Sequence, residues 1–185
     1  VEALLGSVQK RRAQLAWLKR IAKTPPADDG TDLPALSDKE RRALVRAKAH
    51  YERAMALQPG QHWFITQYVS LGVILDDTLD EQWHKAGLAA AIQAIRHRDT
   101  WAHTSIVELR LLAAFATDCD KEKVEERFDN EIADLLDRQD DRFQVPATWR
   151  QLQRYGHWWP TSPLLVRLAR SGAKTLHSQS SDISL

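Results

Sequence analysis

The chain has 185 residues, of which 28% are charged and 43% hydrophobic, and its formal net charge is +1. This is the composition of a soluble globular domain, and the net charge alone favours neither a nucleic-acid partner nor a membrane surface. A single cysteine, Cys119, excludes an internal disulfide framework, and no apolar run reaches the roughly 20 residues of a membrane span, so we expect a cytoplasmic protein.

Helical signals dominate the first half of the chain, and strand signals are nearly absent. The apolar spacing predicts a helix over about 2–23, and Pro, Gly and Asp predict a loop over 24–34. A capping box, Ser37-x-x-Glu40, predicts the start of a second helix that stops before Pro59.

The same spacing continues through the second half of the chain. Further helices are predicted over about 62–75, 80–97, 101–117 and 121–138, and a loop is predicted over 139–146. Two last helices open near Pro146 and at Ser162-Pro163, because proline is favoured in a first helical turn. The sequence therefore predicts an all-α fold of about eight helices, joined mostly as antiparallel hairpins.

Small and aromatic residues recur on these helices at fixed spacings. In order, the motifs are Leu5-Gly6, Ala47-x3-Tyr51-x2-Ala54-x4-Pro59, Tyr68-x2-Leu71-Gly72-x2-Leu75, Gly87-x3-Ala91-x2-Ala94 and Trp101-x3-Ser105. Small residues let a neighbouring helix approach, so we predict that Ala47, Tyr51 and Ala54 form a buried hairpin interface. Over residues 1–138 the chain resembles a tetratricopeptide-repeat protein, although the loop over 24–34 is too long for a regular repeat of about 34 residues.

The resemblance implies a fold and a function. The fold would be a right-handed solenoid of hairpins over 1–138, with capping helices over 139–178 and a disordered tail over 179–185. The chain would be a non-enzymatic scaffold, without cofactor or metal, that holds a peptide or protein partner in a concave groove. The first helix of each hairpin lines that groove in the family, which selects Lys10, Arg11, Thr66, Val69, Val73, Asp76, Asp77, Ile106 and Arg110. The cadence is also similar to bacterial repeat modules beside caspase-like effectors, which implies a defence or signalling assembly.

One acidic motif offers an alternative from another class. Asp76-Asp77-x-x-Asp80 has the spacing with which terpenoid-synthase-type enzymes hold magnesium, so a small α-helical Mg-dependent enzyme is the rival. However, Thr78-x-x-Glu81 has the pattern of a second capping box, and acids are favoured in the first turn of a helix. We therefore expect an acidic turn between two helices, with no metal.

The last third of the chain interleaves arginines with aromatic residues. Its aromatic residues are Trp149, Tyr155, Trp158 and Trp159, and its bases include Arg150 and Arg154. Such a segment could stack nucleobases, which makes a nucleic-acid-binding helical module the third hypothesis. We favour a capping helix pair whose aromatic side chains close the end of the repeat core, and we regard nucleic acid as an unlikely partner.

Overall fold

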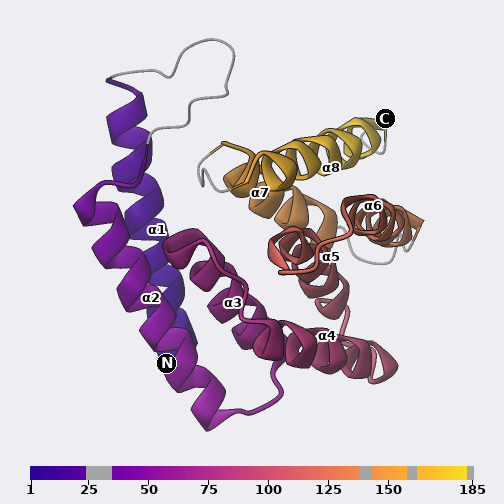
Figure 1. Cartoon of the computed structure of the whole chain (residues 1–185), viewed down its shortest axis with the longest axis horizontal. Helices are drawn as coiled ribbons and strands as arrows, with labels where there is room; N and C mark the ends of the chain where they lie inside the picture. Colours follow the sequence, from indigo (N-terminus) through magenta and orange to yellow (C-terminus); the bar gives the residue numbers. More distant parts are fainter. Residues whose placement is uncertain (24–34, 138–142, 158–161, 183–185) are drawn as a thin grey trace.

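The computed structural model describes residues 1–23, 35–137, 143–157 and 162–182, and this part of the chain is entirely helical apart from its turns (Figure 1). Its elements are α1 (Glu2–Ile21), α2 (Asp38–Leu57), α3 (His62–Asp76), α4 (Glu81–Arg96), α5 (Ala102–Leu112), the 3-10 turn η1 (Ala113–Phe115), α6 (Lys121–Asp137), α7 (Gln144–His157) and α8 (Pro163–Asp182). The predicted all-α class with eight α-helices is thus confirmed over these ranges. The predicted loop over 24–34 lies outside them, as does the first half of the loop predicted over 139–146; the second half differs from the prediction, because α7 already begins at Gln144. None of the described helices combines the length and apolar character that a membrane crossing requires.

The helices pack as consecutive pairs. α1 packs against α2, α3 against α4, α5 against α6 and α7 against α8, while α2 also contacts α3 and α4 contacts α5. The last pair departs from this order, because α7 packs on α5 and α8 packs on α6. In Figure 1 the indigo and violet α1–α2 pair forms one end of the molecule, and the later pairs lie to its side.

The interface between α1 and α2 confirms the predicted buried hairpin contact. Ala47, Tyr51 and Ala54 are all buried. The α1 backbone approaches the Tyr51 ring so closely that a Cβ atom at Gly6 would lie 2.9 Å from a ring carbon. Glycine at this position therefore permits the close packing of the two helices. The Tyr51 hydroxyl also lies 3.0 Å from the Ser7 Oγ, which satisfies both groups.

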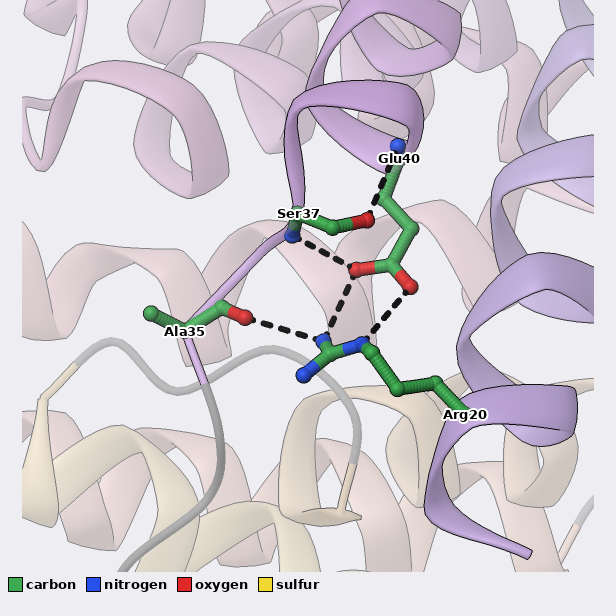
Figure 2. A network of polar contacts seen from close by, with 4 residues as sticks. All are labelled: Arg20, Ala35, Ser37 and Glu40. Carbon is green, nitrogen blue, oxygen red and sulfur yellow. Dashed lines mark hydrogen bonds and ion pairs between the residues drawn. The ribbon is translucent and has the colours of Figure 1, made fainter. Parts of the chain in front are cut away.

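A polar network fixes the other end of this hairpin (Figure 2). The predicted capping box is present, since the Ser37 side chain accepts from the Glu40 N–H and the Glu40 carboxylate accepts from the Ser37 N–H at 2.9 Å. Arg20 of α1 donates to both oxygens of the same carboxylate, from Nε at 3.2 Å and Nη2 at 2.9 Å. Arg20 Nη2 also donates to the Ala35 carbonyl at 2.9 Å. The buried Glu40 carboxylate therefore caps α2 and ties it to α1 at once.

Two helix ends differ from the sequence prediction. α5 ends at Leu112 and continues only as the 3-10 turn η1, because the last turn of a helix often tightens where the chain reverses. α8 runs on to Asp182, into the tail that was predicted to be disordered over 179–185. No proline or glycine follows Gly172 in this helix, so nothing in the sequence breaks it earlier. Residues 183–185 lie outside the described ranges.

The α7–α8 pair closes the hydrophobic core. Leu152 and Tyr155 of α7, with Leu165 and Leu176 of α8, are buried in the same core cluster as the residues of α1 to α6. Trp149 stacks on His177 with ring centroids 5.8 Å apart. These contacts attach the last helix pair to the core of the earlier helices, and the capping role over 139–178 stays a prediction. The predicted aromatic positions 158 and 159 lie outside the described residues.

Candidate binding cleft

A cleft of about 290 Å³ lies where the odd-numbered helices converge. α1, α3, α5 and α7 are the first members of the four helix pairs, and each contributes side chains to its wall, together with Tyr51 of α2. The lining residues are Ser7, Lys10, Arg11, Gln14, Tyr51, Trp63, Gln67, Trp101, Thr104, Ser105, Glu108, Ala147, Arg150, Gln151 and Arg154. We call this site the basic cleft.

A buried carboxylate forms the floor of the basic cleft. Glu108 of α5 is only 4% exposed. Gln67 Nε2 donates to Glu108 Oε2 at 3.1 Å, while Gln151 Nε2 and the Tyr155 hydroxyl donate to Oε1 at 2.7 Å and 2.5 Å. These three neutral donors come from α3 and α7, so the carboxylate joins three helices. Because its oxygens already accept three hydrogen bonds, Glu108 serves the architecture of the cleft more than it serves a ligand.

Lys10 lies directly beside this network. Its side chain is buried, with 7% exposure, and its Nζ donates to Gln67 Oε1. Burial lowers the pKa of Lys10 to about 7, although the charge of Glu108 opposes this effect and the charge of Arg154 adds to it. Near neutral pH the ammonium group is therefore close to losing its proton. An anion entering the cleft would stabilise the charged form of this lysine.

The remaining charges of the basic cleft are cationic. Arg11 and Arg150 are exposed on α1 and α7. Arg154 is partly buried, and its Nη1 donates to Gln151 Oε1 at 2.6 Å. Among the lining residues, Glu108 is the one acid, so four basic side chains surround one carboxylate. The positive charge thus exceeds the negative charge inside a concave, partly dry site, which favours an anionic ligand.

Two tryptophans lie in the wall of the basic cleft. Trp63 is 38% exposed and packs edge-on against Tyr51 at 5.7 Å, whereas Trp101 is 47% exposed. The backbone N–H of Trp101 donates to Asp99 Oδ1 at 3.0 Å, which fixes the turn before α5. Asp99 in turn bonds through Oδ2 to His62 Nε2 at 3.1 Å. These contacts fix the backbone at Trp101, and much of its aromatic surface is accessible to a partner.

His62 also contacts a serine, so a serine, a histidine and an aspartate form one hydrogen-bonded series. Its Nδ1 lies 2.9 Å from the Ser105 Oγ, and its Nε2 faces Asp99. In hydrolases such a chain activates the serine, but catalysis also requires N–H groups aimed at the developing oxyanion. Ser105 lies in the first turns of α5, where its own N–H donates to the Trp101 carbonyl, and both Ser105 and His62 are almost fully buried. We assign the three side chains to the joining of α3 and α5.

Four residues predicted to line a groove lie inside the protein. Val69 and Val73 of α3 are 1% and 0% exposed, and Thr66 is fully buried, with its hydroxyl donating to the His62 carbonyl at 2.8 Å. Ile106 of α5 is buried in a small cluster with α4. The predicted groove positions on α3 and α5 therefore need correction, because a partner cannot reach these side chains. α3 is buried on nearly all sides, so the residues of α3 that were predicted to face a groove belong to the hydrophobic core.

The remaining predicted groove residues on α3 and α5 are already engaged elsewhere. Arg110 Nε donates to Glu131 of α6 at 3.3 Å. Lys48 of α2 pairs with Asp76 at 3.0 Å, and Asp77 is the left-handed C-cap residue of α3, with φ of 51°. None of Arg110, Asp76 and Asp77 lines the basic cleft, whereas Lys10 and Arg11 do. Two of the nine predicted positions therefore belong to this site.

The motif Asp76-Asp77-x-x-Asp80 forms the predicted acidic turn between two helices. Asp80 is the N-cap residue of α4, and its Oδ1 accepts from the Trp83 N–H at 3.1 Å. This corrects the predicted cap, which was assigned to Thr78. The helix break separates Asp76 from Asp80, and no group of three or more His, Cys, Asp or Glu side chains in the described ranges is arranged to hold a metal ion.

Most residues of the basic cleft were absent from the predicted site. Gln67, Glu108 and Gln151 carry no recognisable motif, because their shared role arises only when α3, α5 and α7 meet. Arg150 lies in the basic, aromatic C-terminal segment that the sequence did single out, and Trp101 was predicted as a repeat position rather than as an exposed wall residue. A buried glutamate and glutamines within apolar helices were the available signal, since such groups need partners.

The relation of this chain to known proteins was tested at three levels. Comparisons with protein-family models, with curated proteins and with solved structures gave no match.

Proposed function

We propose that the chain is a non-enzymatic interaction scaffold that binds an acidic segment of a protein partner in the basic cleft. One observation carries this proposal: the first helix of every pair contributes to a single cleft, in which four basic side chains surround one carboxylate that is already hydrogen-bonded. The use of first helices is what a tetratricopeptide-like solenoid would give, so the finer fold assignment belongs to the same proposal. A place in a cytoplasmic bacterial defence or signalling assembly rests on that resemblance alone.

Affinity and orientation would come from different parts of the basic cleft. The exposed Arg11 and Arg150 would attract an acidic side chain, although exposed ion pairs contribute only about 0–1 kcal/mol each. The buried Lys10 would contribute more, because a hydrogen bond to a charged group in a dry site is worth about 1.5–3 kcal/mol. The faces of Trp63 and Trp101 would bury an apolar side chain of the partner. We therefore expect a peptide with an acidic residue next to an aliphatic or aromatic one.

The resemblance to tetratricopeptide-repeat proteins favours a carboxylate of a protein segment as the anion in the cleft. A carboxylate and a nucleic-acid phosphodiester each carry one negative charge, so the resemblance to a peptide-binding family ranks these two ligands. The tryptophans could stack nucleobases, and this makes nucleic acid an outcome to be tested. We rank an acidic protein segment first because of the resemblance to a peptide-binding family.

Peptide display tests the proposal even though the partner is unidentified. A random peptide library is selected on the wild-type chain and counter-selected on Arg11→Glu combined with Arg150→Glu, which reverses the two exposed charges of the basic cleft. The matched control reverses two exposed bases of α6, Lys121→Glu with Arg127→Glu, and so changes the net charge equally. The enriched peptides should contain an acidic residue beside an apolar one, and they should bind the control but not the cleft variant.

A second readout locates the bound peptide. A photo-crosslinking amino acid replaces Trp101 in the cleft or, as the control, Trp83, which is exposed on α4 outside it. Cross-links from position 101 alone would support the proposal. Enrichment of basic or purely apolar peptides, equal cross-linking from both positions, or tighter binding of a single-stranded oligonucleotide would each overturn it.

A further inference from the structure

A second groove lies on the outer face of the α1–α2 pair, and it is also basic. Its volume is about 460 Å³, and it shares no lining residue with the basic cleft. The lining residues are Gln9, Arg12, Leu15, Ala16 and Lys19 of α1 and Lys39, Arg42, Ala43 and Arg46 of α2. Five of them are basic and none is acidic. We call this site the outer groove.

The five basic side chains of the outer groove form no ion pair within the described part of the chain. Arg12, Lys19, Lys39, Arg42 and Arg46 are all exposed, and none of them makes an ion pair or a side-chain hydrogen bond to any other residue that the structure describes. Neighbouring bases of the same hairpin do have partners, since Arg20 binds Glu40. An unneutralised cluster of this kind repels itself and attracts an anionic partner.

The shape of the outer groove fits a helix. On α1 its residues recur as Arg12, Ala16 and Lys19, and on α2 as Lys39, Ala43 and Arg46. Both series follow the spacing of one helical face and span two turns, or about 10 Å along the axis. Ala16 and Ala43 lie between bases at both ends of the groove, and Arg42 lies beside Ala43. Small residues in such a position let a third helix approach both α1 and α2 closely.

Apolar surface lies among these charges. Leu15 lines the outer groove and is 43% exposed. Val45, half exposed, lies in a neighbouring depression that Asp38, Arg41, Arg42 and Arg46 also line. These side chains would pack against an apolar stripe on a bound helix. The combination of an aliphatic centre and basic ends is the complement of an amphipathic helix with acidic flanks.

We infer that the outer groove binds an acidic amphipathic helix of a partner protein. A single-stranded nucleic acid fits less well, because no aromatic side chain lines the groove to stack its bases. A membrane surface fits less well because the apolar residues lie in a groove between helices, whereas insertion needs a protruding apolar face. The inference is independent of the basic cleft, which uses other side chains.

The position of Lys39 makes a charge-reversal variant suitable for testing this inference, because the variant should stay folded. Lys39 follows Asp38 in the first turn of α2, where the helix dipole disfavours a cation. Replacement by glutamate should therefore stabilise α2, and replacing Arg42 as well only exchanges one like-charge pair for another. The variant Lys39→Glu with Arg42→Glu should consequently have a melting temperature no lower than that of the wild type, so that lost binding cannot be ascribed to unfolding.

The experiment measures binding of a synthetic Glu/Ala/Leu peptide whose glutamates flank a leucine stripe on one helical face. A peptide of the same composition, with glutamates on all faces, is the peptide control. The matched protein control is Arg11→Glu with Arg150→Glu, which makes the same charge change in the basic cleft. We expect the amphipathic peptide to bind the wild type and the cleft variant alike, to weaken with added salt, and to lose at least about tenfold in affinity in the outer-groove variant.

Each other result would contradict the inference in a distinct way. Equal binding of both peptides would show that the groove recognises negative charge and not one face of a helix. Loss of binding in the Arg11/Arg150 variant alone would place the peptide in the basic cleft and leave the outer groove without a role. Tighter binding of oligothymidylate or of phosphatidylserine vesicles, lost in the Lys39/Arg42 variant, would assign the groove to nucleic acid or to a lipid surface instead.

Discussion

The buried Lys10 makes the stability of this protein depend on pH in a direction that can be worked out. In the folded chain its pKa is lowered to about 7, chiefly by burial, whereas an exposed lysine has a pKa of about 10.4. Between these values the unfolded chain holds a proton that the folded chain has released. Folding therefore releases a proton, and raising the pH through this window stabilises the fold.

The size of the effect follows from the same two pKa values. Each pH unit inside the window is worth about 1.4 kcal/mol of unfolding free energy for one group. Moving from about pH 7.5 to about pH 9.5 should therefore raise the free energy of unfolding by roughly 2–3 kcal/mol. The stabilisation is absent below the folded pKa and is complete only above the unfolded one.

Denaturant titrations at the two pH values measure this change in unfolding free energy, and two lysine variants show whether Lys10 causes it. Lys10→Met keeps an unbranched side chain but has no proton to release, so its unfolding free energy should not rise between the two pH values. Lys85→Met, which replaces an exposed lysine of α4, should keep it. The reasoning is refuted if Lys10→Met shows the same rise as the wild type, or if the wild type becomes less stable over this range.

Three further predictions concern helix packing, capping and chemistry. Ala47→Leu should overpack the buried α1–α2 interface and lower the unfolding free energy by about 1–3 kcal/mol. Ala89→Leu, on the exposed side of α4, should change the unfolding free energy little. An unaltered denaturation midpoint for Ala47→Leu would contradict the burial of Ala47 in this interface. Asp80→Ala should lower the unfolding free energy by about 0.5–2 kcal/mol, and Asp80→Asn should lower it much less, because asparagine caps a helix as well as aspartate does. Stoichiometric Mg²⁺ binding in calorimetry that Asp80→Asn abolishes would instead indicate that Asp80 is a metal ligand. Ser105→Ala should cost about 1–3 kcal/mol, because it removes the partner of the buried His62 Nδ1 while the bond from Nε2 to Asp99 remains. A fluorophosphonate probe should not label the wild type, and labelling that is lost in Ser105→Ala would reveal a hydrolase.

Local chemistry made several elements predictable from the sequence. Ser37 and Glu40 specify the start of α2 because both members of the capping box act within one turn. The spacing of Ala47 and Tyr51 specifies a buried face because helical periodicity places them on one stripe. In both cases the residues that decide the structure are close together in the chain.

The groove residues on α3 could not be predicted by counting positions from a repeat. The register placed Val69 and Val73 on a ligand-facing stripe, but α3 is covered on nearly all sides. A helix that is apolar all round is a buried helix, and the segment from His62 to Leu75 contains no Asp, Glu, Lys or Arg. This signal was available, and it outweighs the repeat register.

The basic cleft was harder to predict because it depends on contacts between distant segments. Lys10 and Arg150 belong to opposite ends of the chain, and only the packing of α7 against α5 brings them to one site. A single sequence contains no information on that pairing beyond the basic and aromatic composition of its last third. The composition identified the segment but not its neighbours.

The contact of Arg20 with Glu40 and Ala35 has a consequence for protein engineering (Figure 2). It holds the last turn of α1 to the first turn of α2, so side chains of the two helices fix their alignment directly. Lengthening a connection costs little, since each doubling adds only about 0.6 kcal/mol of closure entropy. We therefore expect α1 and α2 to stay aligned when the connection between them is lengthened, for example by an inserted affinity tag.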